Sequence, residues 1–456
     1  MRRFAVVVVV VLTSCLSLMA QTNAGTSVSK TKISGDIDFI VGKYQRIHPV
    51  PYLYTDSLSI LRKCDSLKAT LPNTLSTVEA KRALGKVGAF FSFGHSTLDE
   101  FSLIKDSTNH FPFAVRIEGT RAFVVKNYTN DSTIRKNDEI MRINGVNTEN
   151  VVTELMRCSS FERPETKAYY MGTYFSYYLR FYYEWHSALF KLSIKNQAGE
   201  VKNYTLARIQ PKEKKAFQDY NLYFKEPSVA VMKISIFRNR KKFKNFLRSS
   251  FDSLKKNKTK KLLIDLRGNP GGNSDLVWDL AAYLTNNEIS VEGAGIIKTS
   301  TESKKQNRKA YIKWYMYPVY PFVYLISDAR PLFFKKDGAV TVYREEKKKP
   351  RRVGELFKGQ VFVLVDRGTY STASLLTSSF QCHNIARIVG VGTGEPVIGD
   401  GNAVSVQLPN TKYKFDIGTE VFYNACYRNA DSNRMLIPDI NSSGIDDLLK
   451  RLEHQQ

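Results

Sequence analysis

Ser371 lies where a buried strand gives way to a helix. An apolar, β-branched run from Val361 to Val365 ends shortly before Gly368, and small residues that suit a helix begin at Thr372. The first N–H groups of a helix have no partner within it and favour negative charge, so a hydroxyl here can act as a nucleophile beside half of an oxyanion hole. The same position also suits a helix N-cap, which is a purely structural role.

A glycine-rich turn earlier in the chain has similar properties. The pattern predicts a buried strand from Lys261 to Leu266 and a helix from Asp275 to Asn286, joined by a turn that contains Gly271 and Gly272. Glycine lets the backbone approach a ligand closely with its N–H groups exposed. An ordinary strand-to-helix turn is the alternative, but the full string IDLRGNPGG is far more specific than a glycine pair.

Four strings occur in the order found in peptidase family S41, the tail-specific or C-terminal-processing serine proteases. They are Asp265–Gly272 (DLRGNPGG), Tyr370–Ser374 (YSTAS), Gly394–Pro396 (GEP) and Ile437–Asp439 (IPD). The chain resembles this family over most of its length. The resemblance implies Ser371 as the nucleophile, with an oxyanion hole formed by the N–H group of Gly271 or Gly272 and that of Thr372. It also implies a ClpP/crotonase-like catalytic domain, a polypeptide substrate and no cofactor.

The general base is predicted to be a histidine. One branch of the family uses a lysine in a GEPxxGK motif, whereas this chain reads GEPVIGD, with Asp400 in the lysine's place. The other branch, similar to the tricorn protease core, uses a histidine in a Gly-His-Ser/Thr motif. Residues 93–98 read FGHSTL, which makes His95 the expected base, and imidazole suits that role because its pKa lies near neutrality.

The group that orients His95 is harder to assign. The tricorn-like pattern has a glutamate shortly before the final Pro-Asp, but Ser432 holds that place here, and Gly94 stands where the tricorn core has a serine. We predict that the adjacent Asp431 approaches His95, directly or through Ser432 or Ser96. The remaining choices are Glu395, Asp400 or no carboxylate at all. If no carboxylate does, the chain is a catalytically impaired homologue that binds peptides or lipids in the cell envelope, because loss of the orienting group costs orders of magnitude in rate.

The first residues predict export. Residues 1–20 combine a basic start with a short apolar core and end at Ala20, which suits a cleaved signal peptide. Ala24 offers a second cleavage site. The apolar stretch is too short for a stable membrane span. Leu12–Cys15 also fits a lipoprotein box, so anchoring at Cys15 is an alternative. Both alternatives place the protein in the periplasm or cell envelope.

The composition is strongly basic, with a formal net charge of +25. Much of the excess lies between Arg238 and Lys261, which we interpret as an amphipathic helix with a solvated lysine face. No nucleic-acid-binding motif accompanies this charge, so nucleic acid is not an expected partner. Attraction to anionic envelope surfaces or acidic substrates fits the charge better, and a basic adhesion protein is an alternative that rests on charge alone. The oligomeric state is not encoded in these features.

Four cysteines follow the signal segment: Cys64, Cys158, Cys382 and Cys426. Their wide spacing predicts no zinc or other metal site. Export permits disulfides. The last two lie in the predicted catalytic region and form either a disulfide or two buried thiols.

The pattern divides the mature chain into three parts. Residues 30–105 predict helices, with starts near Asp36, Leu58 and Thr77. Residues 111–210 resemble a PDZ domain, chiefly in the string from Ile134 to Val146, whose Asn-Gly pair predicts a hairpin turn. Residues 215–456 alternate strands and helices, which is typical of a layered α/β catalytic unit. The expected fold class is therefore α/β, or α+β, with several domains.

Two aromatic segments interrupt these parts. Lys167–Phe190 predicts an inserted helix that packs between domains, with a hydrophobic peptide-binding surface as the alternative. Trp314–Ile326 contains Pro318 and Pro321 and is interpreted as strand or loop in an insertion over the catalytic domain, where it could form a lid.

Overall fold

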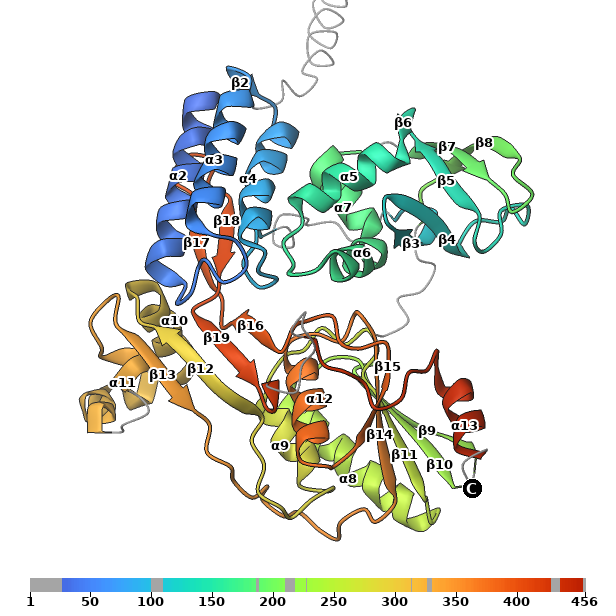
Figure 1. Ribbon diagram of the computed structural model, residues 1–456, viewed down its shortest axis with the longest axis vertical. Helices are drawn as coiled ribbons and strands as arrows, with labels where there is room; N and C mark the ends of the chain where they lie inside the picture. Colours follow the sequence, from blue (N-terminus) through green and yellow to red (C-terminus); the bar gives the residue numbers. More distant parts are fainter. Residues whose placement is uncertain are drawn as a thin grey trace, which may run out of the picture.

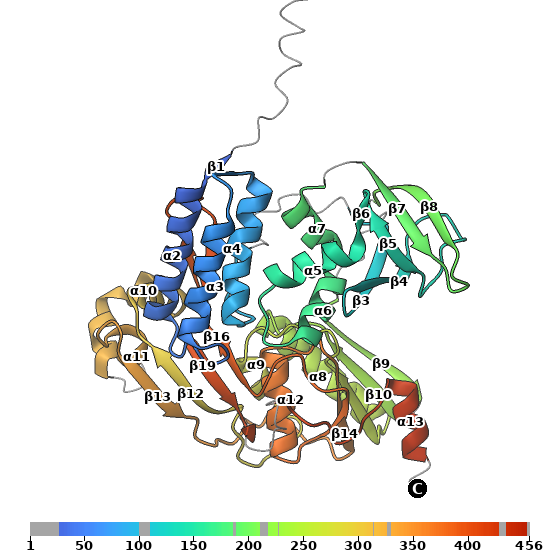
Figure 2. The ribbon, with the colours of Figure 1, turned by 45° about the horizontal axis from the view of Figure 1, so that its top comes forward.

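The computed structural model describes residues 27–99, 110–185, 188–209, 218–226, 228–312, 314–325, 330–427 and 435–453. The predicted signal segment, Cys15 and Asp431 lie outside these residues. The predicted multidomain α/β class is confirmed. Two N-terminal parts lie side by side over a larger α/β part (Figures 1 and 2). Within the described residues, no helix combines the length and apolar character that a membrane crossing requires.

Three helices form the first part: α2 (Lys30–Ile47), α3 (Ser57–Thr70) and α4 (Thr77–Phe91). Each begins at a side-chain cap, namely Ser29, Asp56 and Ser76. The Ser29 cap explains why α2 begins before the expected Asp36, because the side chain accepts a hydrogen bond from an otherwise free N–H group of the first turn. The chain leaves α4 four residues before His95, and a short pair of strands, β1 (Val28–Ser29) and β2 (Thr74–Leu75), ties the bundle together.

The second part is a sheet in the order β3-β4-β5-β7-β8, flanked by three helices. The strands are β3 (Phe113–Glu118), β4 (Arg121–Asn127), β5 (Glu139–Ile143), β7 (Leu189–Lys195) and β8 (Val201–Ala207), and β6 (Val146–Asn147) pairs with β5. The predicted Asn144–Gly145 hairpin turn is confirmed, with φ values of 50° and 82°. The identity of this part as a PDZ domain stays a prediction.

The three helices of the second part are α5 (Thr148–Cys158), α6 (Pro164–Thr173) and α7 (Phe175–Tyr183). The last two contain most of the aromatic segment. The predicted single helix is therefore two short ones, α6 and α7. Their aromatic side chains pack inward: Tyr178, Phe181 and Tyr182 are all buried. This burial supports the packing interpretation of the segment.

The third part contains a five-stranded sheet in the order β15-β14-β11-β10-β9. Its strands are β9 (Tyr220–Glu226), β10 (Val229–Ile234), β11 (Lys261–Asp265), β14 (Gln360–Val365) and β15 (Arg387–Gly390), and the last four are mutually parallel. Its helices are α8 (Arg240–Lys256), α9 (Asp275–Ala281), α12 (Thr372–Cys382) and α13 (Ile445–Glu453). The predicted alternation is confirmed. The expected end of α9 at Asn286 is wrong, because its last turn tightens into hydrogen bonds such as Leu284 N–H to the Ala281 carbonyl.

This sheet brings the two predicted turns together. Strands β11 and β14 are neighbours, with Asp265 paired to Leu364. Because both strands are parallel, their carboxyl ends meet at one edge of the sheet, where ligands bind in open α/β sheets. The glycine turn after β11 and the Ser371 turn after β14 therefore lie side by side.

A second sheet has the order β13-β12-β19-β16. Its strands are β12 (Glu292–Lys298), β13 (Val340–Arg344), β16 (Ile398–Gly401) and β19 (Glu420–Asn424), and α10 (Thr301–Tyr311) and α11 (Arg330–Phe333) lie between the first two in the chain. The interpretation of Trp314–Ile326 as strand or loop is wrong, since Trp314–Leu325 forms a 3-10 helix, η1. Pro318 and Pro321 suit it, because they are one three-residue turn apart and their fixed φ is compatible with that helix.

A hairpin from the last third of the chain packs on the first helices. Strands β17 (Val404–Gln407) and β18 (Lys414–Ile417) lie beside α2 and α4 (Figure 1). Buried Asp36 of α2 accepts the N–H groups of Asn410 and Thr411 from the tip of the hairpin at 2.9 and 2.8 Å. Part of the predicted 215–456 unit therefore shares its core with the helices of the 30–105 unit.

The two late cysteines are joined. Cys382 at the end of α12 forms a disulfide with Cys426, while the thiols of Cys64 and Cys158 are buried. The structure thus decides between the two alternatives that the sequence left open. The bridge fixes the far end of the helix that begins at Ser371 to the segment after β19.

Candidate active site

Ser371 has a backbone conformation that is unusual for a residue with a side chain. Its φ is 54° and its ψ is −128°, and it lies at the N-cap position of α12 without making a side-chain cap hydrogen bond. Such backbone conformations cost about 1–3 kcal/mol and recur at functional sites. Its N–H group donates to Glu395 Oε2 at 2.7 Å. The capping role is therefore absent, and the hydroxyl is free to face the neighbouring loop.

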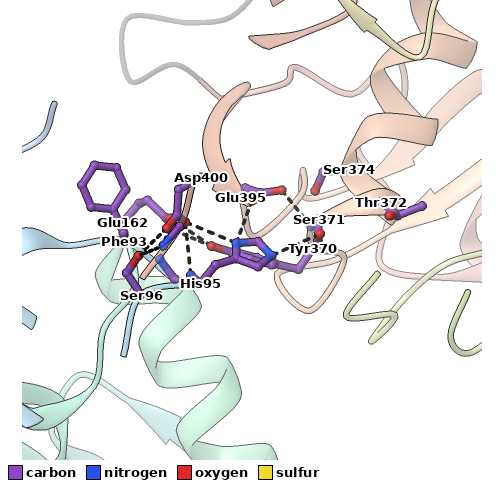
Figure 3. A network of polar contacts seen from close by, with 12 residues as sticks. Phe93, His95, Ser96, Glu162, Tyr370, Ser371, Thr372, Ser374, Glu395 and Asp400 are labelled. Atoms are coloured by element: carbon purple, nitrogen blue, oxygen red, sulfur yellow. Dashed lines mark hydrogen bonds and ion pairs between the residues drawn. The ribbon is translucent and has the colours of Figure 1, made fainter. Parts of the chain in front are cut away.

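His95 faces that hydroxyl. Its Nε2 atom lies 3.2 Å from Ser371 Oγ, although the residues are 276 positions apart in sequence. Its side chain is 24% exposed, so the imidazole is accessible on one side only. Figure 3 shows the ring between Ser371 and Asp400. A nucleophile and a base within hydrogen-bond reach are the first requirement for nucleophilic catalysis.

Asp400 of β16 occupies the other nitrogen of the imidazole. Its Oδ1 atom lies 3.3 Å from His95 Nδ1 and also accepts the backbone N–H group of His95 at 3.2 Å. Its Oδ2 atom accepts the Ser96 hydroxyl at 2.6 Å, and that hydroxyl in turn accepts the Gly418 N–H group. These bonds hold the carboxylate so that Nδ1 carries the proton and Nε2 faces the serine as an acceptor.

Charge stabilises the protonated imidazole. Burial favours the neutral ring, but the hydrogen bond and charge of Asp400, with further contributions from Glu395 and Glu162, raise the pKa of His95 to about 9. For Asp400, burial works toward a higher pKa, yet the hydrogen bond and charge of His95 outweigh it and lower the pKa of the carboxyl group below its ordinary value. Asp400 is thus the ionised partner of the pair.

Two more buried carboxyl groups surround the pair. Burial, opposed by His95 and reinforced by the charges of Glu162 and Asp400, raises the pKa of Glu395 well above its ordinary value. Burial and the charge of Asp400 raise the pKa of Glu162 to about 7. Burial therefore favours the protonated form of Glu395. This side chain holds the backbone of the serine, and its Oε1 atom lies 3.8 Å from His95 Nδ1.

Gly94 is required by its neighbour. A Cβ atom at this position would lie 2.0 Å from the hydroxyl of buried Tyr370. That hydroxyl donates to Glu162, which also accepts the Gly94 N–H group at 2.9 Å. Tyr370 therefore fills the space that a side chain at position 94 would need.

The backbone of the glycine turn offers one free donor. The N–H group of Gly271 already donates to Asn269 Oδ1 at 2.8 Å. Among the described residues, no acceptor is found for the N–H groups of Gly272 and Thr372. The Thr372 hydroxyl donates to the Gly272 carbonyl at 2.7 Å, which ties the two segments together. Gly272 has a φ of 133°, and a Cβ atom there would collide with the Phe237 carbonyl, so only glycine fits.

A cavity of about 380 Å³ opens beside these groups. Its first wall is formed by His95, Ser371, Gly272 and Thr372, and its second by residues of β12, β16 and β19. The nucleophile, the base and both free N–H donors therefore face one space. Within the described part of the chain, no group of three or more His, Cys, Asp or Glu side chains is arranged to hold a metal ion.

The sequence predicted most of these residues, but it favoured Asp431 over Asp400 as the carboxylate. Asp431 lies outside the described residues, whereas Asp400 contacts His95 directly. The signal for Asp400 was present in GEPVIGD, as a carboxylate where the other branch of the family has its lysine.

Residues 228–441 match the family model of peptidase family S41. This part of the chain belongs to that family. It is accordingly a serine-type peptidase, a hydrolase whose substrates are polypeptides. No curated protein matches the chain.

Solved structures support the fold. Mature CPAF complexed with lactacystin is 14% identical, covers 90% of this chain and 94% of its own, and has a TM-score of 0.61. A mutant of CPAF is 13% identical, covers 91% and 93%, and has a TM-score of 0.62. The arrangement of helices and sheets over nine-tenths of this S41 peptidase is thus that of a known protein fold.

Proposed function

We propose that this chain is an exported serine endopeptidase in which Ser371 is the nucleophile, His95 the general base and Asp400 the group that orients His95. The observation that carries the proposal is the alignment of three side chains, with His95 Nε2 at 3.2 Å from Ser371 Oγ and His95 Nδ1 at 3.3 Å from Asp400 Oδ1. Three functional groups meet in this order although they come from three separate regions of the chain.

In the first step, Ser371 Oγ attacks the carbonyl carbon of the scissile bond while its proton moves to His95 Nε2. The negative charge that develops on the carbonyl oxygen is stabilised by the N–H groups of Gly272 and Thr372, and removal of one such donor typically costs about 3 kcal/mol of transition-state stabilisation. Asp400 stabilises the imidazolium that forms and keeps its own charge throughout.

In the second step, the imidazolium gives its proton to the leaving amine nitrogen as the C–N bond breaks, which leaves an acyl group on Ser371. A water molecule then attacks this ester, and His95 again takes the proton. Collapse of the second tetrahedral intermediate returns the proton to Ser371 Oγ and releases the carboxylic acid product.

The catalytically impaired homologue is the alternative. It rested on the lack of an orienting carboxylate near His95 and on Gly94. Asp400 supplies a carboxylate at hydrogen-bond distance, and Gly94 is explained by the position of Tyr370. Both observations favour the catalytic proposal.

Labelling with a fluorophosphonate probe tests the nucleophile. We expect the wild-type protein to be labelled above neutral pH and Ser371→Ala to be silent. The variant should stay folded, because the Ser371 side chain makes no cap hydrogen bond that the change could remove. Ser249→Ala, at an exposed position of α8, is the matched control and should label like the wild type. Labelling that persists in Ser371→Ala would show that another residue reacts.

We also propose export to the periplasm or cell envelope. The support is the signal-like composition of residues 1–20 together with the Cys382–Cys426 disulfide, since disulfides persist in oxidising compartments. The net charge of +25 would favour contact with anionic envelope surfaces. Cell fractionation and the mass of the mature N-terminus test this proposal, and retention of residues 1–20 in a cytoplasmic fraction would contradict it. Acyl labelling that is lost in Cys15→Ala would identify a lipoprotein.

A further inference from the structure

The second wall of the catalytic cavity carries two glutamates. Glu292 of β12 and Glu420 of β19 line it together with Asn402. The hydroxyl of Tyr343 in β13 bridges the carboxylates: it lies 2.5 Å from Glu292 Oε2 and also contacts Glu420 Oε1. Asn402 Nδ2 donates to the second oxygen of Glu420. Three strands therefore hold two carboxylates at fixed positions across the cavity from Ser371.

The backbone is adapted to this arrangement. Tyr343 pairs with Gly295 of β12, and a Cβ atom at Gly295 would lie 2.3–2.4 Å from atoms of the Tyr343 ring. The ring can cross β12 toward Glu420 only because this position has no side chain. The bridged carboxylates are thus a built feature of the sheet.

Within the described part of the chain, no lysine or arginine pairs with these carboxylates. Among the described residues, neither Glu292 nor Glu420 forms an ion pair, although the chain has 68 lysines and arginines against 43 acidic residues. Glu420 is only 8% exposed. Burial, then the charge of Glu420, raises the pKa of Glu292 to about 7. A buried carboxylate without a cation is unfavourable, and a positive charge brought into the cavity would relieve that cost.

We propose that this cavity binds the side chain of a lysine or arginine in the substrate, at the residue whose carbonyl group is attacked. This inference rests on the proposed peptidase function. The N–H groups of Gly272 and Thr372 would hold the carbonyl oxygen of that residue, so its side chain is the one nearest the cavity. Lysine and arginine donate charge-assisted hydrogen bonds to carboxylates.

The remaining lining suits such a side chain. Leu375 and Phe422 provide apolar surface in the same cavity. The methylene groups of lysine and arginine pack on apolar surface while the charged end reaches a polar partner. An acidic substrate side chain would be repelled by Glu292 and Glu420, and an aliphatic one would leave both without a cation.

Matched peptides test the inference. Two internally quenched peptides are compared that differ only in lysine or norleucine before the cleaved bond, and norleucine keeps the methylene chain but lacks the amine. We expect the wild type to cleave the lysine peptide with kcat/KM higher by roughly tenfold to a hundredfold, the range expected for hydrogen bonds between charged groups. A ratio near one, or below one, would overturn the inference.

Variants connect the preference to the two glutamates. Glu292→Gln and Glu420→Gln should each bring the lysine-to-norleucine ratio toward one. Glu288→Gln removes an exposed carboxylate four positions before Glu292 that does not line the cavity, so it should keep the wild-type ratio. An unchanged ratio in both Glu292→Gln and Glu420→Gln would contradict the assignment, whatever the overall rate.

A second measurement does not depend on turnover. Peptidyl diphenyl phosphonates with lysine or norleucine at the same position react with an activated serine, and their labelling rates give the same ratio. If the norleucine phosphonate labels as fast as the lysine phosphonate, and the norleucine peptide is cleaved as fast as the lysine peptide, the cavity inference fails while the peptidase proposal stands. If no compound labels Ser371, the peptidase proposal fails as well.

Discussion

The four-stranded sheet carries buried carboxylates at two places, and their electrostatic surroundings differ. Asp400 of β16 faces His95 and accepts two hydrogen bonds from it. Glu292 and Glu420, on β12 and β19, face a tyrosine and an asparagine instead. The pKa of Asp400 is lowered despite burial, whereas burial raises those of Glu292 and Glu420.

The difference separates two uses of a buried carboxylate. Asp400 has its cation within the protein, which fits its proposed role of positioning and stabilising the base. The glutamate pair lacks one among the described residues, so its charge is available to a ligand.

Asp400→Asn should have the largest effect. Without the carboxylate, the imidazole loses the partner that fixes its tautomer, and kcat should fall by about 10³–10⁴ with little change in KM, as in serine proteases that lose the corresponding group. Steady-state kinetics on one peptide measure this loss. Asp446→Asn, in a solvent-exposed part of α13, is the control. A decrease of less than about tenfold would remove Asp400 from the mechanism.

The pH dependence of kcat/KM should also report the contact between Asp400 and His95. The neutral imidazole accepts the proton, so kcat/KM should rise with pH, with a midpoint near the raised pKa of about 9 for His95. Asp400→Asn removes the main stabilisation of the imidazolium, so the midpoint should move to lower pH. Identical midpoints in both proteins would show that Asp400 does not set the pKa of His95. Glu395 and Glu162 also face the ring and remain in both proteins.

Asp400→Asn is expected to reduce activity, whereas Glu292→Gln should increase the stability of the folded protein. The pKa of Glu292 is raised to about 7 in the folded protein, so ionisation opposes folding, and the stability of the wild type falls as pH rises from about 4.5 through 7. Glutamine does not ionise, so the variant lacks this loss of stability. The variant should gain about 1–3 kcal/mol in free energy of unfolding relative to wild type between pH 5 and pH 8. Urea denaturation at the two pH values measures the change, and a gain independent of pH would contradict an uncompensated charge.

Tyr343→Phe should produce the smallest change. It removes the hydroxyl between the two glutamates, which contributes about 1 kcal/mol as an ordinary hydrogen bond and more when its acceptors are charged. The loss of stability should therefore be larger at pH 8 than at pH 5. Thermal unfolding at both pH values gives the comparison, for which Tyr315→Phe, an exposed tyrosine of η1, serves as control. An equal loss at both pH values would mean that the bridge does not depend on carboxylate charge.

Local patterns predicted one half of the site. The Ser371 turn, the glycine turn and the strands before them are encoded in short strings, because an apolar run followed by glycine and small residues determines a strand, a turn and a helix start. His95 was found through its motif. The strand alternation of the catalytic part likewise follows from hydrophobic runs of strand length.

Contacts between distant residues were beyond such patterns. Asp400 contacts a histidine 305 positions away, and the sequence marked it only as a replaced lysine and as one of the choices left after Asp431. Asp431 was chosen by its place before Pro-Asp, a criterion that carries no spatial information. Glu292, Tyr343 and Glu420 lie on three strands whose pairing sets their proximity, and none belongs to a motif.

The packing of hairpin β17–β18 on the first helices determines when activity can arise during synthesis. The hairpin joins the segment of His95 through the Asp416 N–H group, which donates to the Thr97 carbonyl at 2.8 Å, and Gly418 donates to Ser96. Until residues 404–418 have been translated and have closed this long-range contact, the loop that carries His95 lacks its support, and such contacts form late because the intervening chain must be ordered first. The turn of Ser371, the proposed nucleophile, can therefore form before the loop of His95, the proposed base, is supported. We expect the proposed activity to appear only after the late strands have packed on the earliest helices.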